Sequence, residues 1–286
     1  MYTATFAAML VGSAFAAAGI DYSENGANWG ETVPLCDTGL EQSPIDLHAK
    51  DEVVNDNMRV LGENYFNIPV DSAFSETDYG FKITWPEATR YNQSLTLERG
   101  DGETLSFTPL QFHWHAPSEH TIDGKLYDAE VHFVHTYSNS SLYAVIGVLF
   151  EVGDHSDFVD NLFECIDTRG TADATECDVT GFLGELDMTK FWSYEGSFTT
   201  PPCTEGVKWT VIRKVMTMSA SQLKRFTENL ADDPDFAGGN GNNRLTQPLN
   251  ERTLYLARGD IGYQDGASTV MAGVATAVAA LAALSF

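Results

Sequence analysis

Basic residues are scarce in this chain of 286 residues and do not offset its acids. Sixteen lysines and arginines stand against 41 aspartates and glutamates, which gives a formal net charge of −25 at neutral pH. This charge repels a polyanion at long range, so it argues against nucleic acid as a partner and against anionic lipid bound through a basic patch. Two explanations stay open: solubility in general, or a surface adapted to a salty or acidic exterior medium.

Charged side chains are also absent from both ends of the chain, residues 1–20 and 267–286. Between residues 5 and 20 the chain is apolar and ends in small residues that fit a small-x-small cleavage site. This pattern predicts a secretory signal peptide over residues 1–18, although the usual Lys or Arg at its start is missing. A buried helix is the alternative.

The apolar run at the far end stops with the chain, and no basic residue follows it. Small residues precede it, an order typical of a GPI-anchor signal over residues 266–286, although the usual polar spacer is very short or missing. A plain tail anchor and an alanine-rich helix are the alternatives. The two ends predict an extracellular protein, secreted or held by a lipid anchor on the outer face of the plasma membrane. Its single folded domain spans residues 20–265.

Cysteine is equally scarce, with four residues and no CxxC pair of the kind that binds a metal. Cys165 and Cys177 flank a short polar loop that they are expected to close, which leaves Cys36 to pair with Cys203. Four free thiols are unfavourable in the oxidising compartment that export implies. Two sequons for N-glycosylation, weak signals when taken alone, begin at Asn92 and Asn139.

No repeat, heptad or low-complexity block lies between the two ends. Instead, short apolar segments alternate with Gly, Asn, Asp and Pro, which predicts a mainly β domain with few peripheral helices. The expected strands include residues 80–85, 94–97, 110–115, 129–137, 142–152 and 207–215, and the expected helices are residues 157–166 and 219–229.

One short stretch carries histidines at a spacing that places them on the same face of a strand. His113 and His115 are two residues apart, so a strand places both rings on one face and Phe112 and Trp114 on the other. After a proline and an Asp-Gly turn signal, the chain returns as a second strand that carries His132. Three histidines can therefore converge from two adjacent antiparallel strands.

Three neutral imidazoles with one open position are typical of a catalytic zinc site, whereas four protein ligands close a structural one. Gln111 and Glu130 can each accept the free N–H of a ligand ring and fix its orientation. The alternative is a set of histidines bonded within a β core, which a lone His would favour but three at this spacing do not. The other histidines are expected to be structural or exposed: His120 and His135 buried, His48 and His155 at the surface or in loops.

Several motifs together give a specific resemblance. QSPIDL (residues 42–47), QFHWHAPSEHTIDG (111–124), AEVHFVH (129–135) and GSFTTPPCTEGVKW (196–209) resemble the α-class carbonic anhydrases in family order, as does YSENGANWG (22–30). The resemblance covers nearly all of the mature chain. It implies a central, mostly antiparallel twisted sheet of about ten strands, with peripheral short helices and a cone-shaped cavity that reaches the metal.

The resemblance also implies the activity. That activity is zinc-dependent, reversible hydration of carbon dioxide to bicarbonate and a proton by zinc-bound hydroxide, with the three strand histidines as ligands. The Thr199 hydroxyl then accepts from the hydroxide and donates to Glu119, which can only accept, and so it orients the nucleophile. A Cys36–Cys203 bridge is implied as well, as in the secreted and membrane-anchored members.

An apolar wall is expected beside the metal, because carbon dioxide is apolar and forms no strong hydrogen bond. The family commonly has an aliphatic residue where this chain has Phe198, so a narrower pocket is expected here. The expected pocket residues are Val134, Val145, Phe198, Thr200, Val207 and Trp209.

Fast members export the proton through a histidine partway up the cavity, and the matching segment here, residues 77–83, has none. Tyr79 or Asp78 falls near that position, and neither has the near-neutral pKa that suits a shuttle. Tyr22 and Asn92 are further candidates for ordering cavity water. We therefore expect turnover to be limited by proton transfer and relieved by imidazole-like buffers.

The residues present argue against two other classes of function. A ligand-binding relative without catalysis would lack a zinc histidine, whereas this chain keeps all three, together with Glu119 and Thr199. Another kind of zinc hydrolase would carry an HExxH helix, which this sequence lacks.

Overall fold

The computed structural model describes residues 20–55, 59–64, 68, 73–77, 80–91, 93–98, 104–137, 142–174, 176–231 and 241–258. The expected signal peptide and C-terminal tail lie outside these residues, as do Asp78, Tyr79, Asn92 and Asn139, so what was expected of them stays a prediction. Within the described part, every helix is too short or too polar to cross a membrane.

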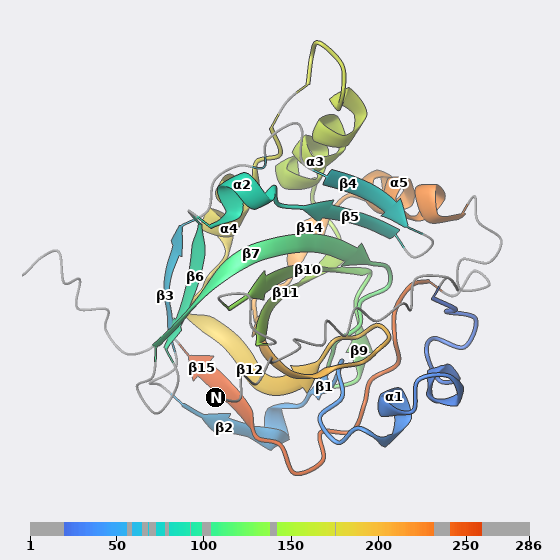
Figure 1. The fold of residues 1–286 in the computed structure, drawn as a ribbon, viewed down its shortest axis with the longest axis vertical. Coiled ribbons are helices and arrows are strands. Elements are labelled where there is room, and N and C mark those ends of the chain that lie inside the picture. Colours follow the sequence, from blue (N-terminus) through green and yellow to red (C-terminus); the bar gives the residue numbers. More distant parts are fainter. Residues whose placement is uncertain are drawn as a thin grey trace, which may run out of the picture.

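Short strands dominate the described chain, as the alternating pattern predicts, and they form one domain (Figure 1). The strands are β1 (Asp46–Leu47), β2 (Glu52–Val54), β3 (Arg59–Asn64), β4 (Ala73–Thr77), β5 (Gly80–Thr84), β6 (Ser94–Glu98), β7 (Thr104–His115), β8 (Thr121–Ile122), β9 (Lys125–Leu126), β10 (Ala129–Thr136), β11 (Tyr143–Val152), β12 (Lys190–Ser197), β13 (Glu205–Ile212), β14 (Met216–Met218) and β15 (Leu254–Arg258). The helices are η1 (Trp29–Glu31), α1 (Leu35–Thr38), η2 (Ala49–Asp51), α2 (Glu87–Arg90), α3 (Asp157–Thr168), α4 (Val179–Glu185) and α5 (Ala220–Ala231).

Twelve of these strands make one sheet, whose main order is β2-β15-β12-β13-β11-β10-β7-β5-β4. Strand β6 joins β7 to β3, β14 pairs with β11, and β1, β8 and β9 form a separate small sheet. Most pairs are antiparallel, and the parallel ones in the large sheet are β11 with β13, β11 with β14, and β15 with β2. The mainly β, mostly antiparallel fold expected from the sequence is thus confirmed.

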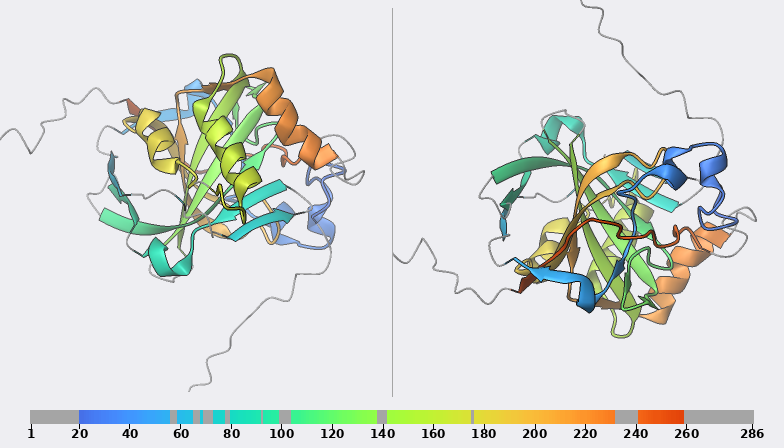
Figure 2. Two further views of the ribbon diagram at one scale, coloured as in Figure 1. Left: turned by 90° about the horizontal axis from the view of Figure 1, so that it is seen from above. Right: turned by 90° about the horizontal axis from the view of Figure 1, so that it is seen from below.

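The central strands carry different chemistry on their two faces, because successive side chains alternate. Phe112, Trp114 and Phe133 belong to a large apolar core that also contains Phe158 of α3 and Phe182 of α4. Figure 2 shows α3, α4 and α5 lying across this face of the sheet. The alternate positions of β7 and β10, which include the three histidines, face the opposite way.

Local signals explain where the longer helices begin. The Ser156 hydroxyl caps α3 by accepting from the Val159 N–H, and the Asp178 carboxylate caps α4 by accepting from the Gly181 N–H. Both helices then bury an apolar stripe in the core on the helix side of the sheet.

Two disulfides tie distant or flanking segments together, with the pairings that the sequence predicts. Cys36 is bonded to Cys203 across 167 residues, which links the N-terminal segment to the loop after β12. Cys165 is bonded to Cys177, which closes the 12-residue separation between α3 and the start of α4.

Candidate metal centre

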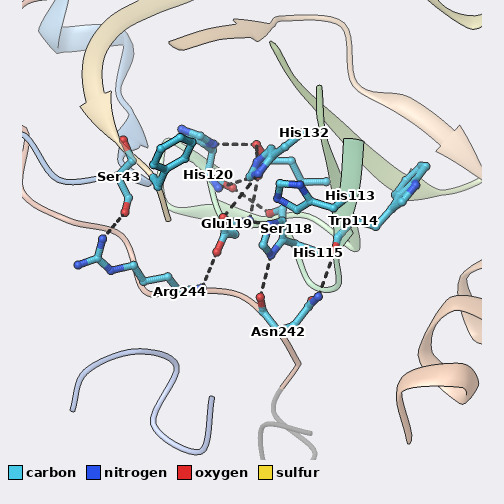
Figure 3. Close-up of polar contacts among 12 residues, drawn as sticks. Ser43, His113, Trp114, His115, Ser118, Glu119, His120, His132, Asn242 and Arg244 are labelled. Atoms are coloured by element: carbon cyan, nitrogen blue, oxygen red, sulfur yellow. Dashed lines mark hydrogen bonds and ion pairs between the residues drawn. The ribbon is translucent and has the colours of Figure 1, made fainter. Parts of the chain in front are cut away.

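Three histidine rings meet on the polar face of β7 and β10. His113 and His115 extend from β7, and the register places His132 of β10 directly opposite His113. The ring centroids lie 5.0, 5.3 and 4.7 Å apart, and one nitrogen from each ring lies within 4.8 Å of the others. Figure 3 shows the three rings grouped together, while Trp114 points away from them. The HxH spacing therefore brings the rings together as expected.

The second nitrogen of each ring lies close to an oxygen. An amide or carbonyl oxygen can only accept, so the facing ring nitrogen carries the proton and the remaining nitrogen keeps its lone pair. The contacts are His113 Nδ1 to Gln111 Oε1 at 2.8 Å, His115 Nδ1 to the backbone oxygen of Asn242 at 2.8 Å, and His132 Nε2 to Glu130 Oε1 at 2.9 Å.

Asn242 is a site residue that the sequence does not reveal. Its backbone oxygen meets His115, its side-chain NH2 donates to the oxygen of Trp114, and its Oδ1 accepts from the Ala116 N–H. The loop lies so close to β7 that a Cβ at Gly241, whose φ is +88°, would sit 2.3 Å from the Ala116 oxygen. A backbone contact between residues 127 positions apart leaves no motif from which it could be predicted.

Glu130 remains a carboxylate although it is completely buried. Burial by itself would raise the pKa of Glu130, but electrostatic interaction and hydrogen bonding with His120 and His132 outweigh it and hold the pKa well below the usual range. The N–H groups of Glu119 and His120 also donate to Glu130 Oε2. An ionised Glu130 is therefore available to accept from the His132 ring.

Electrostatics keep the three clustered histidines neutral. Burial lowers the pKa of all three, that of His115 to about 4, and mutual repulsion with the other two rings lowers the pKa of His113 well below its usual value. Neutral imidazoles with an unprotonated nitrogen are the form in which histidine binds a metal ion.

Two buried atoms beside the cluster support a bound cation. Among the described residues, His115 Nε2 and Glu119 Oε2 have no hydrogen-bond partner, and they lie 3.4 Å apart. A buried polar atom without a partner costs about 1–3 kcal/mol, so the unpartnered His115 Nε2 favours a ligand at that atom. Three imidazole nitrogens form a donor set that zinc prefers, and they leave a fourth position open.

Glu119 links the metal centre to a late loop and to the Thr199 turn. Its Oε1 accepts from the Arg244 N–H at 2.9 Å, a contact visible in Figure 3. Burial raises the pKa of Glu119 to about 7, while His132, Thr199 and the Arg244 N–H act in the opposite direction. Thr199 itself is buried just after β12, and its side chain approaches the carboxyl closely enough to lower its pKa.

An apolar wall stands next to the histidines, where the sequence predicts a pocket. Val134 pairs with Val145, and Val145 in turn pairs with Trp209, whose ring centroid lies 4.8 Å from that of His132. Val207 belongs to the same cluster and Phe198 packs against it, while Thr200 is half-buried in the adjacent turn. Tyr143, which the sequence did not single out, contacts the Phe198 ring with centroids 4.9 Å apart.

The remaining predicted residues belong to other parts of the fold or lie outside the described chain. Tyr22 is buried against Trp29 in the N-terminal cluster that contains the Cys36–Cys203 bridge, so its part in a proton path stays a prediction. The other histidines follow expectation: His120 and His135 are buried, and the side chains of His48 and His155 are 35% and 53% exposed.

Comparison with known proteins gives one consistent family. Residues 24–258 match the model of the eukaryotic-type carbonic anhydrases. Alpha carbonic anhydrase 3 of Arabidopsis thaliana is 35% identical over 229 residues, which cover 78% of this chain and 76% of that protein. The α-carbonic anhydrase of Thermovibrio ammonificans, solved with sulfanilamide, has a TM-score of 0.63 at 32% identity and covers 79% and 93% of the two chains. A dioscorin complexed with ascorbate has a TM-score of 0.67 at 27% identity, covering 82% and 93%.

Proposed function

The chain belongs to the eukaryotic-type carbonic anhydrase family, and from this premise we propose that its three-histidine cluster is the zinc centre at which carbon dioxide is hydrated. As a carbonic anhydrase it acts on carbon dioxide and bicarbonate, and zinc is its cofactor. The observation that carries the proposal is the convergence of three ring nitrogens whose partner nitrogens all lie close to oxygens.

His113, His115 and His132 hold the metal in this proposal. The engaged nitrogens are Nδ1 of the first two rings and Nε2 of the third, which leaves Nε2, Nε2 and Nδ1 as the metal-binding atoms. Gln111, Glu130 and the backbone of Asn242 orient the rings and make them more basic. Zinc, when bound, acts as a Lewis acid that lowers the pKa of water and so makes hydroxide available near neutral pH.

Thr199 and Glu119 orient the nucleophile. An ionised Glu119 has no proton to give, so the Thr199 hydroxyl donates to it and turns its own lone pairs toward the metal centre. Burial raises the pKa of Glu119 to about 7, and a divalent cation beside it would favour the carboxylate. The hydroxyl then accepts from the nucleophile and aims it at the substrate, which is an effect of orientation.

The apolar wall holds carbon dioxide beside the nucleophile. Val134, Val145 and Val207 offer no hydrogen bond, so an apolar gas displaces water there at little cost, whereas the anionic product gains no contact from this wall. Phe198 narrows this pocket together with Tyr143. Proton export lacks a histidine in the matching segment, so imidazole-like buffers are expected to raise kcat.

Stopped-flow carbon dioxide hydration with and without a chelator tests this function. Activity should be lost on zinc removal and return when one zinc per chain is restored. His113→Ala should abolish both activity and stoichiometric zinc, while His155→Ala, at an exposed residue paired with Asp160, should preserve both. Hydration that survives His113→Ala would contradict the zinc mechanism. A zinc-loaded protein without hydration would favour a ligand-binding protein instead.

We also propose that the enzyme is exported, which two disulfides support because they persist in oxidising compartments. Lipid anchoring through residues 266–286 has its own test: a phosphatidylinositol-specific phospholipase should release the protein from cells.

Activity and stability that fall as salt rises from dilute to molar would contradict adaptation of the acidic surface to salt.

A further inference from the structure

Lys82 places a positive charge on the histidine face of the sheet. It lies in the middle of β5, and the register with β7 sets it directly opposite His113. Directly opposed residues of an antiparallel pair point to the same face. The adjacent pair agrees with this assignment, because Ile83 lies opposite Phe112 and both are buried in the core on the helix side.

The charge of Lys82 acts on the pKa of the nearest histidine of the cluster, His113. After burial and the other two rings, Lys82 is the next influence that lowers the pKa of His113. Its side chain is half-buried, and within the described part of the chain it forms no ion pair with a carboxylate. Lys125 and Lys190, in contrast, lie 2.9 and 3.0 Å from Glu151 and Asp187. The Lys82 ammonium is therefore not neutralised by a described acid.

We propose that Lys82 and the three-histidine cluster form a subsite for small monovalent anions, of which the product bicarbonate is the one that the reaction supplies. The inference rests on the proposed function and adds to it one residue, Lys82, that raises the affinity for these anions. An ammonium is a compact point charge, which suits a small anion without demanding one orientation.

The subsite explains how a protein with a large negative net charge can bind an anion. A net charge of −25 repels anions at long range, but at 0.1 M salt charges farther away than about 10 Å are largely screened. A half-buried cation beside the metal centre then adds to the charge of the bound metal in the potential that an anion feels inside the site. Lys82 therefore strengthens the binding of the anionic substrate of the reverse reaction in a strongly acidic enzyme.

Anion titration of the cobalt-substituted enzyme tests the proposal by a readout other than turnover. Thiocyanate and bicarbonate are titrated at one pH and low ionic strength, and the visible absorption of cobalt reports the Kd. Lys82→Gln should raise the Kd about fivefold, the change expected when one partly exposed charge is lost, and Lys82→Thr gives a second neutral side chain suited to a strand. Lys82→Arg should stay near the wild-type Kd, and higher salt should shrink the difference.

Lys190→Gln is the matched control, because it removes the same charge from an exposed ion pair on β12. Its Kd should equal that of the wild type. Equal affinities for wild type and both neutral Lys82 variants would overturn the inference while leaving the proposed function intact. An equal loss in Lys190→Gln would overturn it too, because net charge would then explain the effect. A wild-type protein that takes up neither cobalt nor zinc would instead contradict the proposed function, and the inference with it.

Discussion

Glu130 occupies space that only a glycine at position 147 leaves open: a Cβ at Gly147 would lie 2.8 Å from Glu130 Oε1. Gly147 sits on β11 directly opposite His132, the ring that the same carboxylate oxygen faces at 2.9 Å. The orientation of one ring of the proposed metal centre thus depends on a residue that carries no side chain and lies on the neighbouring strand.

Gly147→Ala should therefore weaken zinc binding. The added methyl group pushes the Glu130 carboxylate away from His132, and loss of such a supporting contact typically lowers metal affinity by about tenfold or more. Competition with a chelator of known affinity measures the change. Gly184→Ala is the control, since a Cβ there would meet nothing within 4 Å. Unchanged zinc affinity in Gly147→Ala would show that Glu130 can move without cost.

The sequence predicts the parts of this site that depend on local periodicity. His113 and His115 can be assigned to one face of a strand because side chains alternate with a period of two, and the Asp-Gly turn returns the chain as the antiparallel strand that carries His132. The core on the opposite face follows from the same alternation. Strand boundaries are less exact: β7 begins at Thr104, six residues before the predicted strand.

Contacts from a distant loop could not be predicted in this way. Asn242 acts through its backbone oxygen, which any residue possesses, and Gly147 acts through the absence of a side chain. Arginine side chains are usually exposed in folded proteins, yet Arg244 is buried. Its guanidinium donates to the backbone oxygens of Cys36 and Ser43, and so it joins the loop behind Glu119 to the N-terminal segment.

Thr199→Val should abolish most hydration while leaving zinc bound. Valine keeps the shape of threonine but has no hydroxyl to donate to Glu119 or to orient the nucleophile, and the loss of such a positioned group costs about 100-fold or more in kcat. Stopped-flow hydration and zinc analysis of the same sample measure both quantities. Thr199→Ser keeps the hydroxyl and should retain most of the activity. Equal activity in Thr199→Val and wild type would remove Thr199 from the mechanism.

Phe198→Leu should widen the pocket. The ring packs on Tyr143 at the edge of the apolar cluster, so its removal opens space beside the histidines without exposing a polar group. Hydrolysis of a bulky aryl ester should increase about tenfold in kcat/KM, because a few carbon atoms in an apolar pocket discriminate by that order. Phe198→Tyr retains the ring, so its hydrolysis of the aryl ester should stay as slow as that of the wild type. A rate that does not differ between the two variants would mean that the ring does not limit access.

The two disulfides should differ in what they contribute to stability. The chain-entropy model gives about 5 kcal/mol for a bridge across 167 residues and about 3 kcal/mol for one across 12. Urea unfolding of the variants Cys36→Ser with Cys203→Ser, and Cys165→Ser with Cys177→Ser, measures both. The first pair should also reduce activity, since the Cys203 N–H donates to the Thr200 oxygen in the turn that carries Thr199. A larger loss from the second pair would contradict the model.

Acid should destabilise the fold through His135, which is fully buried away from the metal-binding rings. Burial lowers the pKa of His135 to about 4, against 6.5 for an exposed histidine. The unfolded chain therefore takes up a proton between these two values while the folded protein does not, so the free energy of unfolding falls as pH drops below 6.5 and stops falling near 4. From neutral pH to about pH 5 the loss due to this residue is about 2 kcal/mol. His135→Gln removes that proton uptake, so urea unfolding at a series of pH values should show the wild type losing its advantage over the variant across this window. A difference between the two proteins that does not change with pH would mean that the folded state can protonate His135, and that its burial carries no cost in acid.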